Sequence, residues 1–264
     1  MKNIRYTLIT GASSGLGKEF SIQCAAVGMN IIMVALPGSN MTSIAENLAL
    51  EYQIEAKVFE FDITDSILLI ERLNYIIENF EVDFLINNAG IGGTASITES
   101  SLEAMDRILQ VNIRSMVSIT QMLLPHLLKQ QKSHIMNISS MAAFTPIAYK
   151  TVYPASKAFI SSFSLGLREE LHDTNLSVSV VYPGPIMTNS GVSIRIMGQG
   201  SKGRIGLLTT AEIVRIALKQ TILKKAVIIP GLWNKINHRL MGILPMEMKL
   251  RIVSRAVKKE IAIK

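Results

Sequence analysis

The chain has 264 residues, of which 48% are hydrophobic and 18% are charged, and its mean hydropathy is +0.33. This composition excludes a disordered chain and a coiled coil, and the length suits one large domain with a substantial core. A single cysteine, Cys24, excludes an intrachain disulfide, and four scattered histidines show no metal-ligand spacing, so we expect a reducing compartment and no metal site.

No stretch approaches the roughly 18 consecutive apolar residues of a spanning helix, and the first residues run directly into a glycine-rich turn without room for a signal peptide. We therefore expect a cytoplasmic protein. The net charge of +7 is uneven, because residues 224–264 carry ten Lys and Arg against two acidic residues. This distribution argues against a nucleic-acid partner for the main domain and keeps an anionic surface open for the tail.

Short apolar runs alternate with amphipathic stretches along the first 185 residues. The strand-like runs cover residues 4–10, 30–36, 56–61, 83–87, 134–139 and 177–182, and helical patterns lie between them at 15–28, 39–52, 66–79, 102–128 and 153–174. A helix near 210–221 and a strand at 226–229 complete the series. The alternation predicts an α/β fold, a Rossmann-type doubly wound parallel sheet of about seven strands. We expect a catalytic domain over residues 1–230 and a helical C-terminal extension over residues 231–264.

A glycine-rich turn follows the first strand, with Gly11, Gly15 and Gly17 in the spacing G-x-x-x-G-x-G. Glycines let the backbone approach a dinucleotide pyrophosphate, and the N-terminus of the next helix offers free N–H groups. A tight structural connection is the alternative. The position directly after the first strand favours the nucleotide interpretation.

Tyr153 and Lys157 lie four residues apart at the start of a predicted helix, where Pro154 is tolerated. A phenol with a pKa of about 10 is a poor base near neutrality, and a nearby ammonium favours the phenolate. An isolated Tyr and Lys at this spacing is more often an ordinary surface pair. The pair is therefore informative only together with other motifs.

Seven motifs occur in one order along the chain, and together they resemble the classical short-chain dehydrogenase/reductase family over about residues 4 to 190. The resemblance implies an oxidoreductase that transfers a hydride between a nicotinamide cofactor and a carbonyl compound or secondary alcohol. The motifs are the glycine turn, Asp62, Asn87-Asn88-Ala89-Gly90, Asn112, Asn137-Ile138-Ser139-Ser140, Tyr153 with Lys157, and Pro183-Gly184.

The resemblance implies four catalytic residues. Tyr153 would donate a proton to the carbonyl oxygen or accept one from an alcohol. Lys157 would lower the pKa of Tyr153 and bind the nicotinamide ribose. Ser140 would orient the substrate oxygen while Ser139 faces the sheet, and Asn112 would hold a water of the proton relay. A buried asparagine paired with backbone is the alternative for Asn112.

The resemblance also implies a cofactor pocket. Asp62, next to Ile63, would accept the adenine amino group, although Asp62 could instead cap the following helix. The turn at the pyrophosphate would be formed by Gly11, Ser13, Ser14, Gly15, Leu16 and Gly17. The adenosine side would be formed by Asn88, Ala89 and Gly90. The nicotinamide side would be formed by Pro183, Gly184, Ile186 and Thr188, with Tyr153 and Lys157 at the ribose.

The choice of cofactor depends on the turn after the second strand. An acidic residue about 20 positions past the glycines would bind the ribose hydroxyl of NAD, and a basic residue would bind the extra phosphate of NADP. Residues 20–45 contain neither. Since no acid repels a phosphate, and Ser39, Asn40 or Lys18 could contact it, we expect NADP(H), with NAD(H) not excluded.

Residues 186–208 carry five glycines and follow the expected nicotinamide contact. They predict a lid over the cleft, although an ordinary loop has the same composition. Its apolar residues favour a lipophilic or aromatic carbonyl substrate; they are Met187, Val192, Ile194, Ile196 and Met197.

The extension contains two basic amphipathic helices that meet at Pro245. Their apolar stripes are Leu232, Ile236, Leu240 and Ile243, and then Leu250, Val253, Val257 and Ile261. We expect the stripes to pack on the catalytic domain or on a second subunit of a homodimer or homotetramer. We also expect weak contact of residues 232–264 with anionic membranes.

Two other interpretations stay open. One is a cofactor-binding sensor or scaffold that has lost catalysis, against which the intact set of Asn112, Ser140, Tyr153 and Lys157 argues. The other is a peripheral membrane protein that acts through its basic tail.

Overall fold

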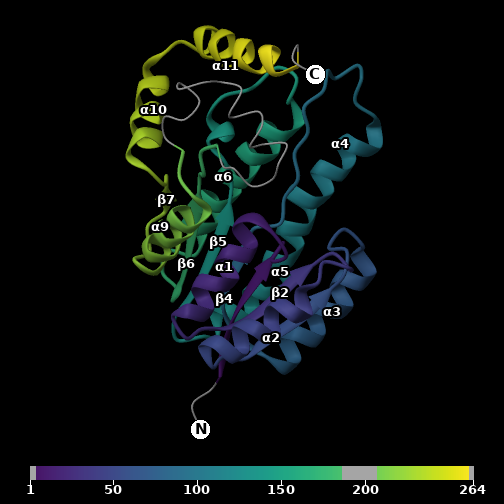
Figure 1. The fold of residues 1–264 in the computed structure, drawn as a ribbon. Helices are drawn as coiled ribbons and strands as arrows, with labels where there is room; N and C mark the ends of the chain where they lie inside the picture. Colours follow the sequence, from purple (N-terminus) through teal and green to yellow (C-terminus); the bar gives the residue numbers. More distant parts are fainter. Residues whose placement is uncertain (1–3, 186–206, 262–264) are drawn as a thin grey trace.

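The computed structural model describes residues 4–185 and 207–261 and is built around a seven-stranded parallel sheet of order β3-β2-β1-β4-β5-β6-β7 (Figure 1). All neighbouring strands are parallel. The predicted Rossmann-type sheet is confirmed. Its strands are β1 (Arg5–Thr10), β2 (Asn30–Ala35), β3 (Ala56–Glu60), β4 (Glu81–Asn87), β5 (Ser133–Ile138), β6 (Leu176–Val181) and β7 (Val227–Ile228).

Helices cover both faces of the sheet, which explains why the strands read as continuous apolar runs. The helices α1 (Gly15–Ala26), α2 (Met41–Tyr52) and α9 (Thr210–Ile222) pack on one face. The helices α3 (Ser66–Asn79), α5 (Met116–Leu128) and α6 (Val152–Glu170) pack on the other. In β1, Ile9 joins the first core and Leu8 the second.

The strand order reverses between β1 and β4, and this places the turns that follow them side by side. In doubly wound sheets, ligands bind at the carboxyl ends of the strands where the order reverses. The glycine turn follows β1, and Asn88, Ala89 and Gly90 follow β4. The sheet therefore gathers the sequence motifs at one edge of the molecule.

The single helix predicted for residues 102–128 is wrong in one respect, because a wider π-helical turn interrupts it. The run consists of α4 (Leu102–Leu109), the π-helical segment η1 (Gln110–Ser115) and α5. The Ser115 hydroxyl donates to the carbonyl oxygen of Gln110 at 2.8 Å, five residues earlier. Single π-helical turns inside helices are frequent at functional sites.

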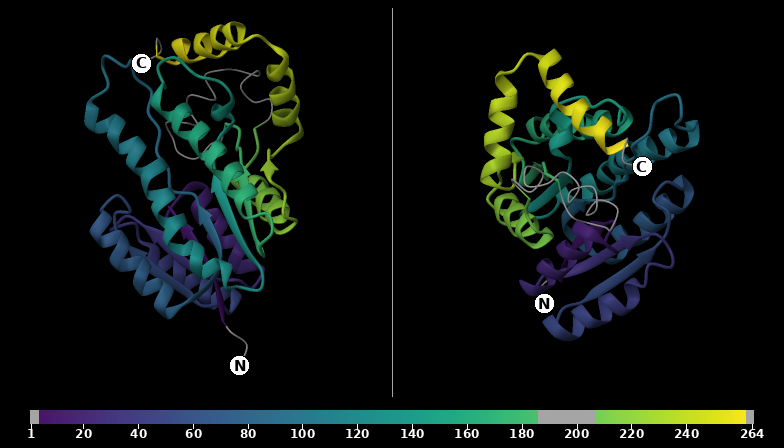
Figure 2. Two further views of the ribbon diagram at one scale, coloured as in Figure 1. Left: turned by 180° about the vertical axis from the view of Figure 1, so that it is seen from behind. Right: turned by 45° about the horizontal axis from the view of Figure 1, so that its top comes forward.

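The extension forms α10 (Leu232–Ile243) and α11 (Met246–Ile261), which lie at the end of the molecule opposite the amino terminus (Figure 2). In α11, Val257 is buried and Leu250 and Val253 are half-buried, so this stripe packs inward as predicted. The Ser254 hydroxyl accepts from the backbone N–H of Ala148 at 3.1 Å. The side chain of Ile261 lies outside the described residues.

Among the described residues, the stripe of α10 does not pack on the catalytic domain, so packing on a second subunit stays the open part of the prediction. Leu232, Leu240 and Ile243 are 71%, 59% and 82% exposed, and Ile236 is half-buried. The side of the helix that faces the catalytic domain instead carries Asn234 and His238, while Lys235, Asn237 and Arg239 are exposed. Asn234, which is 7% exposed, sets this orientation by packing against the turn after β6.

Among the helices of the described residues, none combines the length and apolar character needed to cross a bilayer.

Candidate active site

The turn between β1 and α1 requires glycine at two positions. Gly11 has φ of +66°, in the left-handed region that favours glycine. A Cβ at Gly17 would lie 1.9 Å from the carbonyl oxygen of Gly11 and 2.6 Å from Nδ2 of Asn88. The backbone of this turn is therefore packed too closely for any side chain at Gly17.

The N-terminus of α1 lies directly after this turn. The Ser14 side chain, at the N-cap, makes no capping hydrogen bond, so the first N–H groups of the helix have no side-chain partner there. Leu16 packs its side chain into the core, which leaves only its backbone for a ligand. Gly15 begins the helix with φ of +53°, and Ser13 is half-buried beside it. This geometry suits an anionic group such as a pyrophosphate.

The turn after β4 is tied to the glycine turn by hydrogen bonds. Nδ2 of Asn88 donates to the carbonyl oxygens of Thr10 and Gly11 at 3.0 and 3.2 Å. The Thr10 hydroxyl accepts from the N–H groups of Asn88 and Ala89, both at 3.0 Å. The Asn88 amide thus holds the two turns together, a structural task that the motif alone did not reveal.

Asp62 lies after β3, and the structure decides against its alternative assignment as a helix cap. Asp65 caps α3 by accepting from the N–H groups of Ile67 and Leu68. Asp62 accepts from both the N–H and the hydroxyl of Thr64, and it pairs with Arg107 at 2.8 Å. Burial raises the pKa of Asp62, but the hydrogen bonds from Thr64 and Arg107 outweigh this effect and lower it.

The neighbouring Ile63 packs its side chain in the second core, and its carbonyl oxygen accepts from the Ser115 hydroxyl at 2.9 Å. Only the backbone of Ile63 can therefore face a ligand.

Ser140, Tyr153 and Lys157 come together at the carboxyl end of β5. The side chain of Ser140 hydrogen-bonds with the phenol of Tyr153 and also accepts from the N–H of Ala142 at 3.1 Å. Nζ of Lys157 lies 5.8 Å from the centroid of the Tyr153 ring and donates to the carbonyl oxygen of Ile138 at 3.0 Å. The three side chains form one cluster.

Ser139 has a separate, structural position. It is buried, and its hydroxyl donates to the carbonyl oxygen of Lys157 at 2.8 Å. The expectation that Ser140 and not Ser139 faces the site agrees with this arrangement.

Burial sets the pKa values of the cluster. It raises the pKa of the Tyr153 phenol, and the hydrogen bond with Ser140 offsets only part of the increase. It also lowers the pKa of Lys157 to about 8. The direction for Tyr153 is opposite to the lowering that Lys157 was expected to bring, because loss of solvation outweighs the other effects there.

Asn112 lies in η1 and is fully buried. Its Oδ1 accepts from the N–H of Ile91 at 2.8 Å, and its Nδ2 donates to the carbonyl oxygen of Ile91 and to the Ser156 hydroxyl, both at 2.9 Å. Both amide protons are therefore engaged. A Cβ at Gly90 would lie 3.2 Å from Nζ of Lys157 and 3.3 Å from Oδ1 of Asn112, which brings this loop to the cluster.

The turn after β6 meets the extension. A Cβ at Gly184 would lie 2.7 Å from Nδ2 of Asn234, so α10 rests directly on the Pro183-Gly184 turn. On the same helix, the ring centroid of His238 lies 4.0 Å from the ring centroid of Phe144. Ile186, Thr188 and all five apolar residues of the predicted lid lie outside the described residues.

Sequence reasoning missed Glu60, Asn234 and His238. Glu60 ends β3 and pairs in register with Ala35 at the end of β2. Its carboxylate accepts from the N–H of Gly38 at 3.3 Å and the hydroxyl of Ser39 at 3.2 Å. An acidic group therefore does lie at the turn after β2, although it comes from the neighbouring strand.

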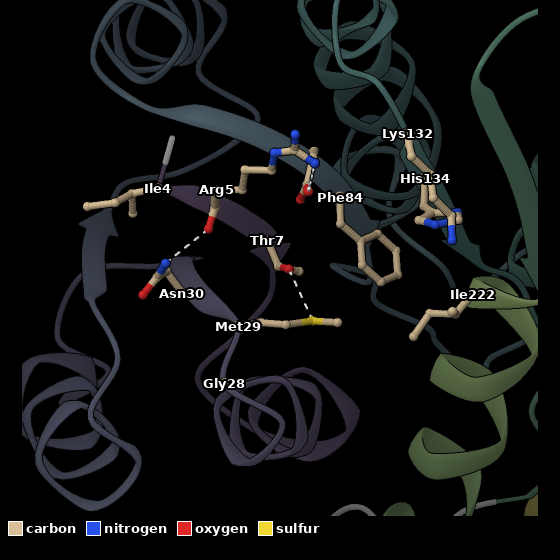
Figure 3. Close-up of a pocket in the computed structure, with 11 residues that line it drawn as sticks. Ile4, Arg5, Thr7, Gly28, Met29, Asn30, Phe84, Lys132, His134 and Ile222 are labelled. Atoms are coloured by element: carbon tan, nitrogen blue, oxygen red, sulfur yellow. Dashed lines mark hydrogen bonds and ion pairs between the residues drawn. The ribbon is translucent and has the colours of Figure 1, made fainter. Parts of the chain in front are cut away.

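A separate cavity of about 550 Å³ opens at the amino ends of the strands, away from these motifs. Arg5, Asn30, Phe84 and His134 line it (Figure 3). The side chain of Asn30 donates to the carbonyl oxygen of Arg5 at 3.1 Å. The cavity contains no residue of the expected catalytic or cofactor sites.

Known proteins share this sequence pattern. A family model for short chain dehydrogenases matches residues 5–197. An uncharacterized oxidoreductase of Staphylococcus epidermidis is 32% identical over 185 residues, 70% of this chain and 79% of that protein. The L-xylulose reductase of Caenorhabditis elegans is 34% identical over 186 residues, 70% of this chain and 72% of that protein.

Solved structures share the fold. The bulky-bulky ketone specific alcohol dehydrogenase of Comamonas testosteroni has a TM-score of 0.77 at 28% identity, covering 92% of this chain and 96% of that one. A short-chain dehydrogenase of Sphingobium yanoikuyae in complex with NADPH has a TM-score of 0.77 at 25% identity, covering 91% and 96%. With the family match over most of the sheet and the motifs gathered at its carboxyl end, the chain belongs to the short-chain dehydrogenase/reductase family of oxidoreductases.

Proposed function

We propose that this chain transfers a hydride between a nicotinamide dinucleotide and a carbonyl compound or secondary alcohol, with Tyr153 as the proton donor. The observation that carries the proposal is the cluster of Ser140, Tyr153 and Lys157 beside the glycine turn. The cofactor, when bound, supplies or accepts the hydride. Side chains of this protein would orient the substrate and transfer the proton.

Tyr153 is suited to the reductive direction. Because burial raises its pKa, the phenol keeps its proton at neutral pH and can donate it to a developing alkoxide. The Ser140 hydroxyl, hydrogen-bonded to Tyr153, would hold the carbonyl oxygen in the same place. Lys157, with a pKa of about 8, is mostly charged at pH 7 and would favour negative charge that develops on Tyr153.

Asn112 acts by positioning in this proposal. Its side-chain amide holds Ile91 and Ser156, so it fixes the loop after β4 against the start of α6. A water in a proton relay would have to use the remaining lone pair of Oδ1 or the backbone of Asn112.

The residues at the switch point fit a dinucleotide. The close backbone approach at Gly11 and Gly17 and the uncapped N-terminus of α1 would hold the pyrophosphate. The turn at Pro183 and Gly184 would border the nicotinamide. The adenosine side would be held by Asp62, Ile63, Asn88, Ala89 and Gly90.

Glu60 leads us to propose that the chain uses both NADP(H) and NAD(H). The sequence favoured NADP(H) because residues 20–45 contain no acid, but the Glu60 carboxylate binds the Gly38 and Ser39 donors that would otherwise contact a 2′-phosphate. Its charge opposes the phosphate and its oxygens can accept from a ribose hydroxyl. Glu60 would thus limit a preference for NADP(H).

Glu60→Gln should therefore shift the ratio of KM values toward NADPH by about fivefold, since one unit charge near the phosphate contributes about 1 kcal/mol in a solvated site. Steady-state kinetics with NADPH and NADH measure this. Glu46→Gln, an exposed change on α2, is the matched control and should leave the ratio unchanged. A wild-type preference beyond roughly a hundredfold for either cofactor would contradict shared use.

The substrate that we propose is a lipophilic ketone. The segment after Ser140 is apolar, and the ring of Phe144 packs at a tilt against Tyr182 with ring centroids 4.5 Å apart. The name of the Comamonas relative, at 28% identity, describes specificity for bulky-bulky ketones. These two observations favour a large apolar carbonyl compound over a sugar.

The reaction is tested by following oxidation of NADPH and NADH with a panel of bulky ketones, aldehydes, 3-oxoacyl thioesters and sugars. We expect turnover to be fastest with a bulky ketone. Faster turnover of a sugar such as xylulose would overturn the substrate class but not the reaction, whereas binding of cofactor without any turnover would favour a sensor or scaffold.

A further inference from the structure

The helix α10 exposes most of its apolar stripe, and Lys235 and Arg239 are exposed beside it. Asn234 and His238, four residues apart, face the catalytic domain, where the ring of His238 packs at a tilt against Phe144. Leu232, Leu240 and Ile243 lie on the opposite side and are exposed. Within the described residues, this apolar stripe is therefore largely uncovered.

The helix α11 also exposes apolar side chains. Its inward side is anchored by Val257 and by the hydrogen bond between Ser254 and Ala148. Its outward side exposes Met248 and Ile252, which are about half exposed. Together with Leu232, Leu240 and Ile243 they define a surface that we call the C-terminal face.

Exposed basic residues lie on the same two helices as the C-terminal face. Among the described residues none of them forms an ion pair, and Glu247 is the one acidic side chain that the structure describes on the two helices. Their charges are therefore free to act on an external partner. These exposed residues are Lys235, Arg239, Arg251, Arg255 and Lys258.

The positive charge of these basic residues favours an anionic lipid surface over a second copy of this chain. A two-fold contact between copies of this chain would bring the basic residues of one copy against those of the other, and like charges at close range are unfavourable. An anionic lipid surface offers apolar volume for the stripe and negative charge for the basic residues. The position of α10 and α11 at one end of the molecule leaves them accessible to such a surface (Figure 1).

We propose that the C-terminal face docks on an anionic bilayer, with Leu240, Ile243 and Ile252 entering the interface and Arg239 and Arg251 contacting lipid phosphates. Docking on a bilayer is independent of the reaction proposed above. The two helices would lie in the plane of the interface and would not span the membrane.

The full chain is tested by sedimentation with vesicles of phosphatidylcholine alone and with vesicles in which one third of the lipid is phosphatidylglycerol. We expect binding to the anionic vesicles only, decreasing as salt rises. The double change Leu240→Ser and Ile243→Ser should weaken binding at least roughly tenfold, since each removes a large apolar side chain from the interface. The double change Arg239→Gln and Arg251→Gln should weaken it roughly fivefold per charge.

Matched control variants lie on other faces. Leu50 and Ile67 are 80% and 82% exposed on α2 and α3, and Lys129 and Lys219 are exposed away from the C-terminal face. Serine at the first pair and glutamine at the second pair should leave binding unchanged. Thermal melting of every variant confirms that it is folded.

Several outcomes would overturn the proposal. They are the absence of binding to anionic vesicles, equal binding to both compositions, and an equal loss in the control variants. A dimer that dissociates on Leu240→Ser and Ile243→Ser, without any vesicle binding, would also overturn it and would assign the face to a second copy.

Discussion

Burial moves the two central ionisable side chains of the site toward their neutral forms. It raises the pKa of Tyr153 and lowers that of Lys157 to about 8. From the sequence alone we expect electrostatic tuning of the phenol by the ammonium. The geometry instead shows Lys157 bonded to Ile138 and Tyr153 to Ser140, so solvation decides the direction.

A single methyl group added at Gly17 tests whether the glycine turn holds the cofactor. In Gly17→Ala the new Cβ would lie 1.9 Å from the Gly11 carbonyl oxygen, and the turn must open to relieve this. We expect affinity for the nicotinamide cofactor to fall by about tenfold to a hundredfold, measured by fluorescence titration.

Gly166→Ala is the matched control, because a Cβ there has no neighbour within 4 Å. It lies within α6, where alanine should stabilise the fold by roughly 0.5–1 kcal/mol and leave cofactor affinity unchanged. Unchanged affinity in Gly17→Ala would show that this turn does not hold the cofactor.

At the scale of the element, the π-helical segment η1 explains how one asparagine reaches several partners. The extra residue in the turn lets Asn112 bond Ile91 and Ser156 while Ser115 bonds Gln110 and Ile63. Period and propensity predict a continuous helix for residues 102–128. They carry no signal for a π-turn, which is stabilised by contacts far away in sequence.

The helices α10 and α11 support the site from outside the segment that the family model matches. Asn234 packs on Gly184, and His238 packs on Phe144. Deletion of residues 232–264 should expose Phe144 and Tyr182, lower the melting temperature and promote aggregation. Because the turn after β6 would lose its support, we expect turnover to fall by on the order of tenfold to a hundredfold.

Thermal melting, light scattering and steady-state rates of the shortened chain measure these effects. A truncated protein that stays monodisperse with the wild-type rate would show that the two helices are an independent appendage.

At the scale of the whole molecule, the layout of the sheet and the motif positions could be predicted from sequence. Six apolar runs alternate with helices, and this pattern determines a parallel sheet whose carboxyl ends bring Gly11, Asn88, Ser140 and Tyr153 together. Glu60 could not be assigned to the cofactor turn, because it arrives from a neighbouring strand through register.

The orientation of α10 also could not be predicted from the periodicity of its apolar residues. An apolar stripe predicts a buried face, and here the contacts of Asn234 and His238 turn these two polar side chains inward instead.

The stability of the whole molecule should depend on pH through His134. Burial, together with the charges of Lys132 and Lys224, lowers the pKa of His134 from 6.5 to about 4. Between these values the unfolded chain binds a proton that the folded chain does not, so the free energy of unfolding should fall by about 2 kcal/mol as pH drops from about 6.5 to 4.

His134→Gln should remove this part of the pH dependence, as measured by urea unfolding at several pH values. His172→Gln, at an exposed histidine, is the control and should leave the slope unchanged. Equal slopes in wild type and His134→Gln would contradict the assignment.

We propose that Tyr153 donates the proton in a nicotinamide-dependent hydride transfer. Wild type and Tyr153→Phe are compared in cofactor affinity and in the rate of reduced-cofactor oxidation with the fastest ketone of the panel. Phenylalanine keeps the ring and removes the transferable proton, so we predict unchanged affinity and a rate lower by about a hundredfold to ten-thousandfold. A Tyr153→Phe variant that retains the wild-type rate would contradict the mechanism.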